Sequence, residues 1–156
     1  MSARLTPELL EKFKDLQTEP IKSKIRNKNT TALAQAIGHK DQKYLGEGAA
    51  ISPAYIGTLV VKGLFSLADA AVKNDKGEDV KLITNPGKIL HGSMGYRYLN
   101  LDAVKDGDVL ITTGKLTKIF VKNDMLFLYA DMVTKKEDGT VIQETNIGAI
   151  CRKGGF

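Results

Sequence analysis

The segment from residue 52 to residue 71 reads Ser52-Pro-Ala-Tyr-Ile-Gly-Thr-Leu-Val-Val-Lys-Gly-Leu-Phe-Ser-Leu-Ala-Asp-Ala-Ala71 and carries the strongest helical pattern in the chain. Ser52 is a favourable N-cap, and Pro53 is a favourable residue for the first helical turn. Apolar residues then recur at intervals of three and four over about four turns, which is typical of a helix with one apolar stripe. They are Ile56, Leu59, Val60, Gly63, Leu64, Leu67, Ala68 and Ala71. Gly63, which costs about 1 kcal/mol in a helix interior relative to alanine, indicates close packing, so we expect a core helix that lies against a sheet.

Beyond residue 88 the pattern changes to the alternation of β-strands. Ile89-Leu90 leads into the first predicted strand, and the strands as a group are 95–101, 109–121, 125–133 and 141–152. In the third, Leu126, Leu128, Ala130 and Met132 oppose Phe127 and Tyr129, and in the last, Ile147, Ala149 and Cys151 share a face. Turn sequences at 106–108, 123–124 and 136–139 predict an antiparallel meander. Helices that precede strands in the chain favour the α+β class, with helices covering one sheet face.

The first half of the chain predicts short helices and loops. A helix from Thr6 to Leu16, with Thr6 as its cap, forms an N-terminal helical extension over residues 1–19. A second helix starts at Thr30 or Thr31 and closes at Gly38. Residues 39–52 are interpreted as a mixed loop and residues 73–88 as a polar connection. At 156 residues, the whole chain (1–156) is expected to be a single domain.

Composition and charge exclude several classes of protein. No run approaches the ~18 apolar residues of a membrane-spanning helix, and the N-terminus lacks a secretory signal, so neither is expected. The single cysteine, Cys151, excludes an intrachain disulfide and a cysteine-based zinc site, and it fits a reducing cytoplasm. The net charge is +5, and residues 22–28 hold four basic residues and no acid. Such a stretch attracts phosphorylated cofactors or an acidic carrier protein, whereas nucleic acid is not expected without an aromatic reader motif.

Short motifs along the chain, in the correct order, resemble those of the MaoC-like hydratases and dehydratases. Residues 36–44, Ala-Ile-Gly-His-Lys-Asp-Gln-Lys-Tyr, resemble the Gly-Asp-x-Asn-Pro-x-His element of that family, and residues 50–55 resemble its Ala-Pro-Pro-Thr-Phe helix start. Leu90-His91-Gly92 and residues 104–109 resemble its His-Gly and Pro-Gly-Asp elements, and residues 143–145 with 151–156 resemble its last strand and Gly-Phe ending. The resemblance covers residues 20–156 and implies the hot-dog fold, a long core helix wrapped by a curved antiparallel sheet.

This resemblance implies hydration or dehydration of fatty-acyl thioesters carried on coenzyme A or acyl carrier protein, with no further cofactor. Active members of the family use an Asp and a His as acid and base, but the matching positions here hold His39 and Tyr44. A tyrosine with a pKa of about 10 is a poor base at neutral pH, so we expect the dyad to be lost. The chain resembles most closely the non-catalytic subunit of heterodimeric (3R)-hydroxyacyl-carrier-protein dehydratases. That likeness implies a homodimer or a heterodimer with a second hot-dog subunit.

The resemblance also assigns substrate-binding roles. The N–H groups of Ala54 and Tyr55, beside Ser52, are expected to receive the thioester oxygen. The residues expected to line or back an acyl channel are Ile56, Leu59, Val60 and Leu64, with His91 and Gly92 near it. The basic residues near 22–28 and 40–43 are expected to face the phosphates of the cofactor or an acidic carrier.

Other interpretations remain open. His39 and Asp41 could form a rewired hydratase site with Tyr44 as a proton donor, or they could be structural, with His39 capping and Asp41 binding loop amides. The chain could also be a non-enzymatic acyl-thioester binding module. A thioesterase is disfavoured because Asp69, near the far end, is the only carboxylate on the core helix. No metal site is expected, since His39 and His91 lack a third ligand.

Overall fold

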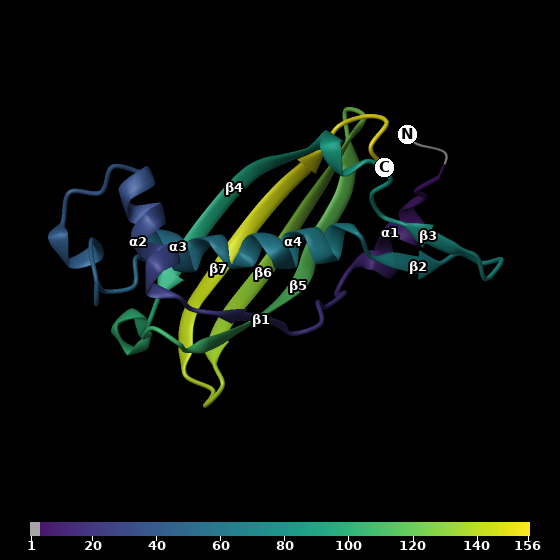
Figure 1. Cartoon of the computed structure of the whole chain (residues 1–156). Helices are drawn as coiled ribbons and strands as arrows, with labels where there is room; N and C mark the ends of the chain where they lie inside the picture. The colour runs from purple at the N-terminus through teal and green to yellow at the C-terminus, as the bar shows by residue number, and fades with distance from the viewer. Residues whose placement is uncertain (1–3) are drawn as a thin grey trace.

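The computed structural model describes residues 4–156, and a five-stranded antiparallel sheet forms its centre (Figure 1). In sheet order the strands are β1 (Ile21–Lys24), β5 (Val109–Lys122), β6 (Met125–Lys136), β7 (Val141–Cys151) and β4 (Ile89–Tyr98). The predicted α+β class is confirmed, and β5, β6 and β7 form the predicted meander. However, β4 pairs with β7, at the far side of the meander, rather than with β5, which follows it in the chain.

The segment that begins at Ser52 forms the core helix in two pieces, α3 (Pro53–Thr58) and α4 (Val60–Ala68). They follow one another across one face of the sheet (Figure 1). The helix therefore ends at Ala68, short of the predicted Ala71. Gly63 is buried, and a Cβ at this position would lie 3.0 Å from the Sδ atom of Met132. The close packing predicted from Gly63 is confirmed, because a larger residue would push the helix away from β6.

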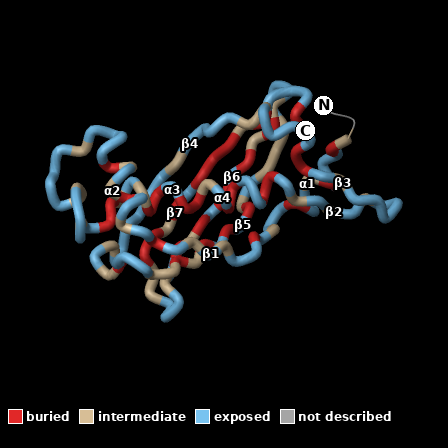
Figure 2. The backbone as a smooth tube through the Cα atoms, viewed as in Figure 1, coloured by how far each residue is buried: buried red, intermediate tan, exposed pale blue. Residues whose placement is uncertain are grey.

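Buried residues are concentrated on the central strands and on the helix that covers them, and together they form the core (Figure 2). The core residues of two of these strands, each at most 2% exposed, are Leu126, Leu128, Ala130 and Met132 on β6 and Ile147, Ala149 and Cys151 on β7. Both predicted strand faces are therefore confirmed. Burial raises the pKa of the Cys151 thiol, which favours its neutral form. Cys151 is a small buried hydrophobe, as predicted.

Shorter elements surround the sheet. They are α1 (Pro7–Phe13), α2 (Asn27–Ala36), β2 (Ala71–Lys73), β3 (Asp79–Lys81) and the 3₁₀ helices η1 (Gln42–Tyr44), η2 (Pro86–Lys88) and η3 (Leu101–Ala103). Strand β1 was not predicted, and the predicted polar connection over 73–88 is wrong in part, since β2 and β3 form a hairpin there. Helix α2 starts at Asn27, earlier than predicted, because the Asp106 carboxylate accepts the Asn27 N–H at 2.6 Å and so caps the helix.

The N-terminal helix packs into the main core. The Thr6 hydroxyl accepts the N–H of Leu9 and caps α1 as predicted, but the helix ends at Phe13 rather than at Leu16. Phe13 is fully buried in the same cluster as α4 and β6. Among the helices of residues 4–156, none is both long and apolar enough to cross a lipid bilayer.

Candidate functional site

The loop between α2 and α3 is held in a defined shape by its own hydrogen bonds. The Asp41 carboxylate accepts the Lys43 N–H at 3.0 Å and caps η1. The Ala50 N–H donates to the Lys43 carbonyl at 2.7 Å, which closes the loop on itself. The Asn27 side-chain amide donates to the Ala49 carbonyl at 2.6 Å and fastens the loop to α2. Residues 39–52 therefore form a fixed structure beside the start of the core helix.

The structure brings His39 and Tyr44 together, with their ring centroids 4.7 Å apart at an interplanar angle of 68°. His39 Nδ1 accepts the backbone N–H of Asp41 at 3.1 Å. The Asp41 carboxylate itself binds the amide of Lys43. The contact between His39 and Asp41 thus involves the backbone of Asp41, whereas an acid–base pair requires the carboxylate to orient the imidazole. These contacts match the structural interpretation of both residues.

A cleft of about 580 Å³ opens between the loop and the segment that leads into β5. Its charged and polar lining includes Lys43, Tyr44, Glu47, Asp102, Lys105 and Asp106. The Lys43 ammonium lies 4.7 Å from the centroid of the Tyr44 ring, and the Tyr44 hydroxyl raises the pKa of that ammonium. Sequence reasoning did not select Glu47, Asp102 or Asp106 as site residues. The segment 104–109, identified from the sequence as a family motif with a turn at 106–108, contributes to this wall of the cleft.

Ser52 occupies the N-cap position of α3, but its side chain does not cap the helix. Its hydroxyl is buried and has no hydrogen-bond partner among the described residues, so the predicted capping role of this side chain is wrong. The Ser52 backbone is fully engaged instead: its N–H donates to the Thr30 hydroxyl at 3.3 Å, and its carbonyl accepts the N–H groups of Tyr55 and Ile56. Buried Thr30 thus holds the backbone of Ser52 at the start of the helix.

The backbone hydrogen bonds at the helix start limit which amides could receive a thioester oxygen there. The Tyr55 N–H donates to the Ser52 carbonyl at 3.0 Å, so of the two amides expected to receive the oxygen, this one is already occupied. Ala54 is exposed, and it lies in the first turn, where an N–H has no acceptor within the helix. Ile56 is fully buried in the core.

His91 and Gly92 lie at the other end of the molecule from the loop. His91 pairs with Ala149 near the start of β4, and the strand bulges between His91 and Ser93. Tyr98, at the end of β4, donates its hydroxyl to the Pro53 carbonyl at 3.0 Å. Seven residues of strand separate His91 from Tyr98, a distance of about 23 Å. Within one chain, His91 therefore does not reach the helix start. Within residues 4–156, no group of three His, Cys, Asp or Glu side chains is placed to hold a metal ion.

An antiparallel sheet in the order β1-β5-β6-β7-β4, with a core helix lying across it, defines a hot-dog domain. The family described as FAS1-like, dehydratase domain region, matches residues 14–145. Because this match spans most of the chain, the protein belongs to the family of FAS1-like dehydratase domain regions. Among curated proteins, no relative matches the chain.

Solved structures share the fold at low sequence identity. A MaoC-like dehydratase from Rhodospirillum rubrum is 13% identical with a TM-score of 0.64, covering 92% of this chain and 94% of its own. The C-terminally truncated HadBC (3R-hydroxyacyl-ACP dehydratase) complex from Mycobacterium tuberculosis is 10% identical with a TM-score of 0.67, covering 88% and 96%. The ChsH1-ChsH2 complex from the same organism is 12% identical with a TM-score of 0.60, covering 88% and 97%. Two of these three structures are complexes of different subunits.

Proposed function

We propose that this chain is the acyl-thioester-binding, non-catalytic subunit of a MaoC-like enoyl hydratase or (3R)-hydroxyacyl dehydratase. The observation that carries the proposal is the loop 39–44. The positions of the family's Asp and His hold His39 and Tyr44, and both His39 Nδ1 and Asp41 Oδ1 accept backbone N–H groups of the loop. The loop is thus maintained as a structural element, while its acid and base are absent.

The acyl chain is proposed to lie outside the single subunit. The four residues predicted to line a channel, Ile56, Leu59, Val60 and Leu64, are at most 7% exposed and pack in the core. These residues, which were expected to line or back an acyl channel, can therefore back one from the core, because their apolar stripe packs on the sheet. The apolar side chain of the helix that remains open is Phe65, 49% exposed. A partner subunit that covers this side would complete a channel.

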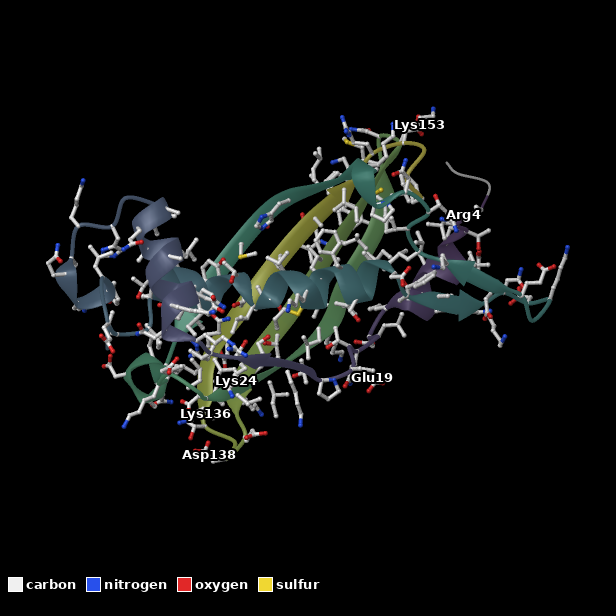
Figure 3. The ribbon with its side chains drawn as sticks, viewed as in Figure 1. Arg4, Glu19, Lys24, Lys136, Asp138 and Lys153 are labelled. Carbon is white, nitrogen blue, oxygen red and sulfur yellow. The ribbon has the colours of Figure 1, made fainter. Side chains whose placement is uncertain are left out.

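The partner is proposed to be a second hot-dog subunit, a copy of this chain or a related protein, docked on the edge of β4. An unprotected edge strand presents unpaired backbone groups to another strand, and proteins block such pairing with charge, proline or short length. The other edge strand, β1, has all three protections: it is only four residues long, it carries Lys22 and Lys24, and Pro20 lies just before it. Figure 3 shows Lys24 on this strand.

By contrast, β4 has ten residues, and most of them are exposed on both faces. Its only Lys or Arg is Arg97, which pairs with Glu144 of the neighbouring strand at 2.5 Å. Exposed apolar residues continue along it: Leu90, Tyr96, Tyr98 and the following Leu99. The bulge between His91 and Ser93 interrupts only the beginning of this edge, and the exposed apolar side chains beyond it favour pairing with another subunit.

The substrate is proposed to be a fatty-acyl thioester of coenzyme A or of acyl carrier protein, in the cytoplasm. The basic segments 22–28 and 40–43 support an anionic carrier, because exposed lysines attract phosphates and acidic proteins. Lys24, Lys40 and Lys43 are all exposed.

Affinity purification of the tagged chain from its native cells tests this function. We expect it to carry a second hot-dog protein with an Asp and a His spaced as in active family members, and the complex should hydrate enoyl thioesters. Replacing the histidine of that second protein should abolish turnover, whereas His39→Ala should leave it unchanged. A complex that loses turnover on His39→Ala would establish the rewired site and contradict the proposal.

A further inference from the structure

A continuous row of polar side chains crosses the helix-facing side of the sheet under α3. Strand register places Thr112, Thr134, Gln143 and Tyr98 side by side on β5, β6, β7 and β4. The first three are fully buried. The two threonine hydroxyls lie 2.9 Å apart, and the Gln143 amide donates to the Thr134 hydroxyl at 3.3 Å. Buried polar groups are costly unless they are bonded, so such a row needs a structural reason.

This polar row divides the apolar interior into two clusters. The larger contains Leu64, Met132 and Ile147, and the smaller contains Ile56, Leu110 and Ile142. Leu110 precedes Thr112 and Met132 precedes Thr134 along their antiparallel strands, so the two clusters lie on opposite sides of the row. The smaller cluster contains the start of the core helix. That end of the molecule is thus joined to the main core partly through polar contacts.

Two members of the row bind carbonyl groups of α3. Gln143 Nε2 donates to the Ile56 carbonyl at 3.0 Å, and the Tyr98 hydroxyl donates to the Pro53 carbonyl at 3.0 Å. The Ile56 carbonyl also accepts the Leu59 N–H at 3.1 Å, a tighter turn than that of an α-helix. The boundary between α3 and α4 lies at Leu59. The glutamine thus binds the core helix where its regular hydrogen bonding changes.

We propose that Gln143 and Tyr98 are positioning residues that set the start of the core helix, and with it the loop 39–52, against the sheet. The inference rests on the proposed function, in which the chain is an acyl-thioester-binding subunit that pairs with a partner. Tyr98 also lies on the β4 edge where the partner is proposed to dock. A docked strand would therefore contact the residue that holds Pro53, which links partner docking to the position of α3 and of the loop before it.

Amide hydrogen exchange of the purified protein tests the proposal with four variants. Tyr98→Phe removes only the hydroxyl that binds Pro53, and its matched control is Tyr96→Phe, whose hydroxyl donates to Met94 and lies beside Gly57 of α3 without a hydrogen bond to the helix. Gln143→Met removes the amide, and its control is Thr145→Val, a buried position two residues along the same strand face. Losing one hydrogen bond should speed exchange of the α3 amides about tenfold. The exchange rates of the β6 amides should change only with the global stability of the protein. In both control variants, exchange in α3 and β6 should match that of the wild type.

Gln143→Glu adds a signature that packing alone would not produce. A protonated glutamic acid can donate its O–H to the Ile56 carbonyl, whereas the ionised carboxylate can only accept. Protection of α3 relative to β6 should therefore approach the wild-type value at acidic pH and fall as the buried carboxyl ionises. The titratable neighbour in the row is Tyr98, whose pKa is raised by burial and by Tyr96, so it stays neutral over this range.

The proposal would be overturned if amide exchange changed equally in α3 and β6 in every variant, or if Tyr96→Phe changed α3 exchange as much as Tyr98→Phe. It would also be overturned if the protection of α3 in Gln143→Glu did not change with pH. Binding of dodecanoyl-coenzyme A, measured by calorimetry on the purified complex, separates this failure from that of the proposed function. If wild-type complex binds the thioester and Tyr98→Phe binds it about tenfold more weakly, both stand. If binding is strong and unchanged in the variant, only the positioning role fails. If the wild-type complex does not bind it, the proposed function fails.

Discussion

Replacing Tyr96 with alanine should weaken association through the β4 edge while leaving the subunit folded. Tyr96 is 43% exposed in the single chain, and its ring stacks on that of Tyr98 at a centroid distance of 5.6 Å. A tyrosine that can bury about 200 Å² therefore offers about 85 Å² to a partner. At about 25 cal/mol per Å², that area is worth about 2 kcal/mol. We expect the dissociation constant to rise about 30-fold.

Sedimentation velocity of the chain together with its partner subunit, over a range of concentrations, measures this change in the dissociation constant. Denaturant unfolding of the isolated chain is needed as well, because Tyr96 also packs against Gly57 of α3. The matched control is Lys24→Ala on β1, the opposite edge of the sheet, which should leave association unchanged. The reasoning would be refuted if Tyr96→Ala left the dissociation constant at its wild-type value, or if Lys24→Ala weakened association equally.

Other predictions concern the core, the buried thiol and the acid stability of the fold. Met132→Ala opens a cavity under Gly63 and should cost about 2–5 kcal/mol in denaturant unfolding; a loss under 1 kcal/mol would contradict the tight helix–sheet contact. Burial raises the pKa of Cys151, so a thiol reagent at neutral pH should react with it far more slowly in native than in denatured protein, and equal rates would show that the thiol is accessible. Burial acts to raise the pKa of Asp108, but the Lys105 N–H and the Lys136 ammonium at 3.0 Å outweigh it and hold that pKa below its ordinary value. The pair, next to the hairpin that Lys136 and Asp138 mark in Figure 3, then stabilises the fold above about pH 4 and loses this effect as the pH falls through the lowered pKa. Asp108→Asn should cost about 1 kcal/mol at neutral pH and flatten the acid limb of the stability curve, so an unchanged limb would refute the assignment.

The core helix and the central strands were predictable because their residues follow a single period. The stripe from Ile56 to Ala68 and the alternation from Leu126 to Met132 each record one buried face, and each is confirmed by burial. What periodicity cannot show is which strand lies beside which. Strand β4 joins β7 across more than 40 residues of chain, and nothing local in Ile89–Tyr98 marks that partner. The prediction placed this strand at 95–101, with Ile89-Leu90 leading into it, whereas β4 spans Ile89–Tyr98.

Elements that depend on distant contacts escaped prediction for the same reason. In β1, half of the residues are lysines that point to solvent, so a paired strand was interpreted only as a basic segment. The early start of α2 depends on Asp106, almost 80 positions away. Thr30, rather than the hydroxyl of Ser52, anchors the start of the core helix.

The candidate site shows the same division between local and distant information. The nearness of His39 and Tyr44 follows from their short separation, and the motif that contains them was recognisable. Their engagement within the loop was not, because it depends on backbone geometry at Asp41. The cleft wall from Leu101 to Asp106 reaches the loop only through the fold.

Hydration of crotonyl- and dodecenoyl-coenzyme A by the purified chain alone, followed at the loss of enoyl absorbance, tests the central claim most directly. The proposed loss of the dyad predicts no turnover of either thioester by a folded protein. Addition of a hot-dog subunit with an intact Asp and His should then produce turnover. Clear turnover by the chain alone that disappears in His39→Ala would contradict the account and establish a catalytic group within residues 39–44.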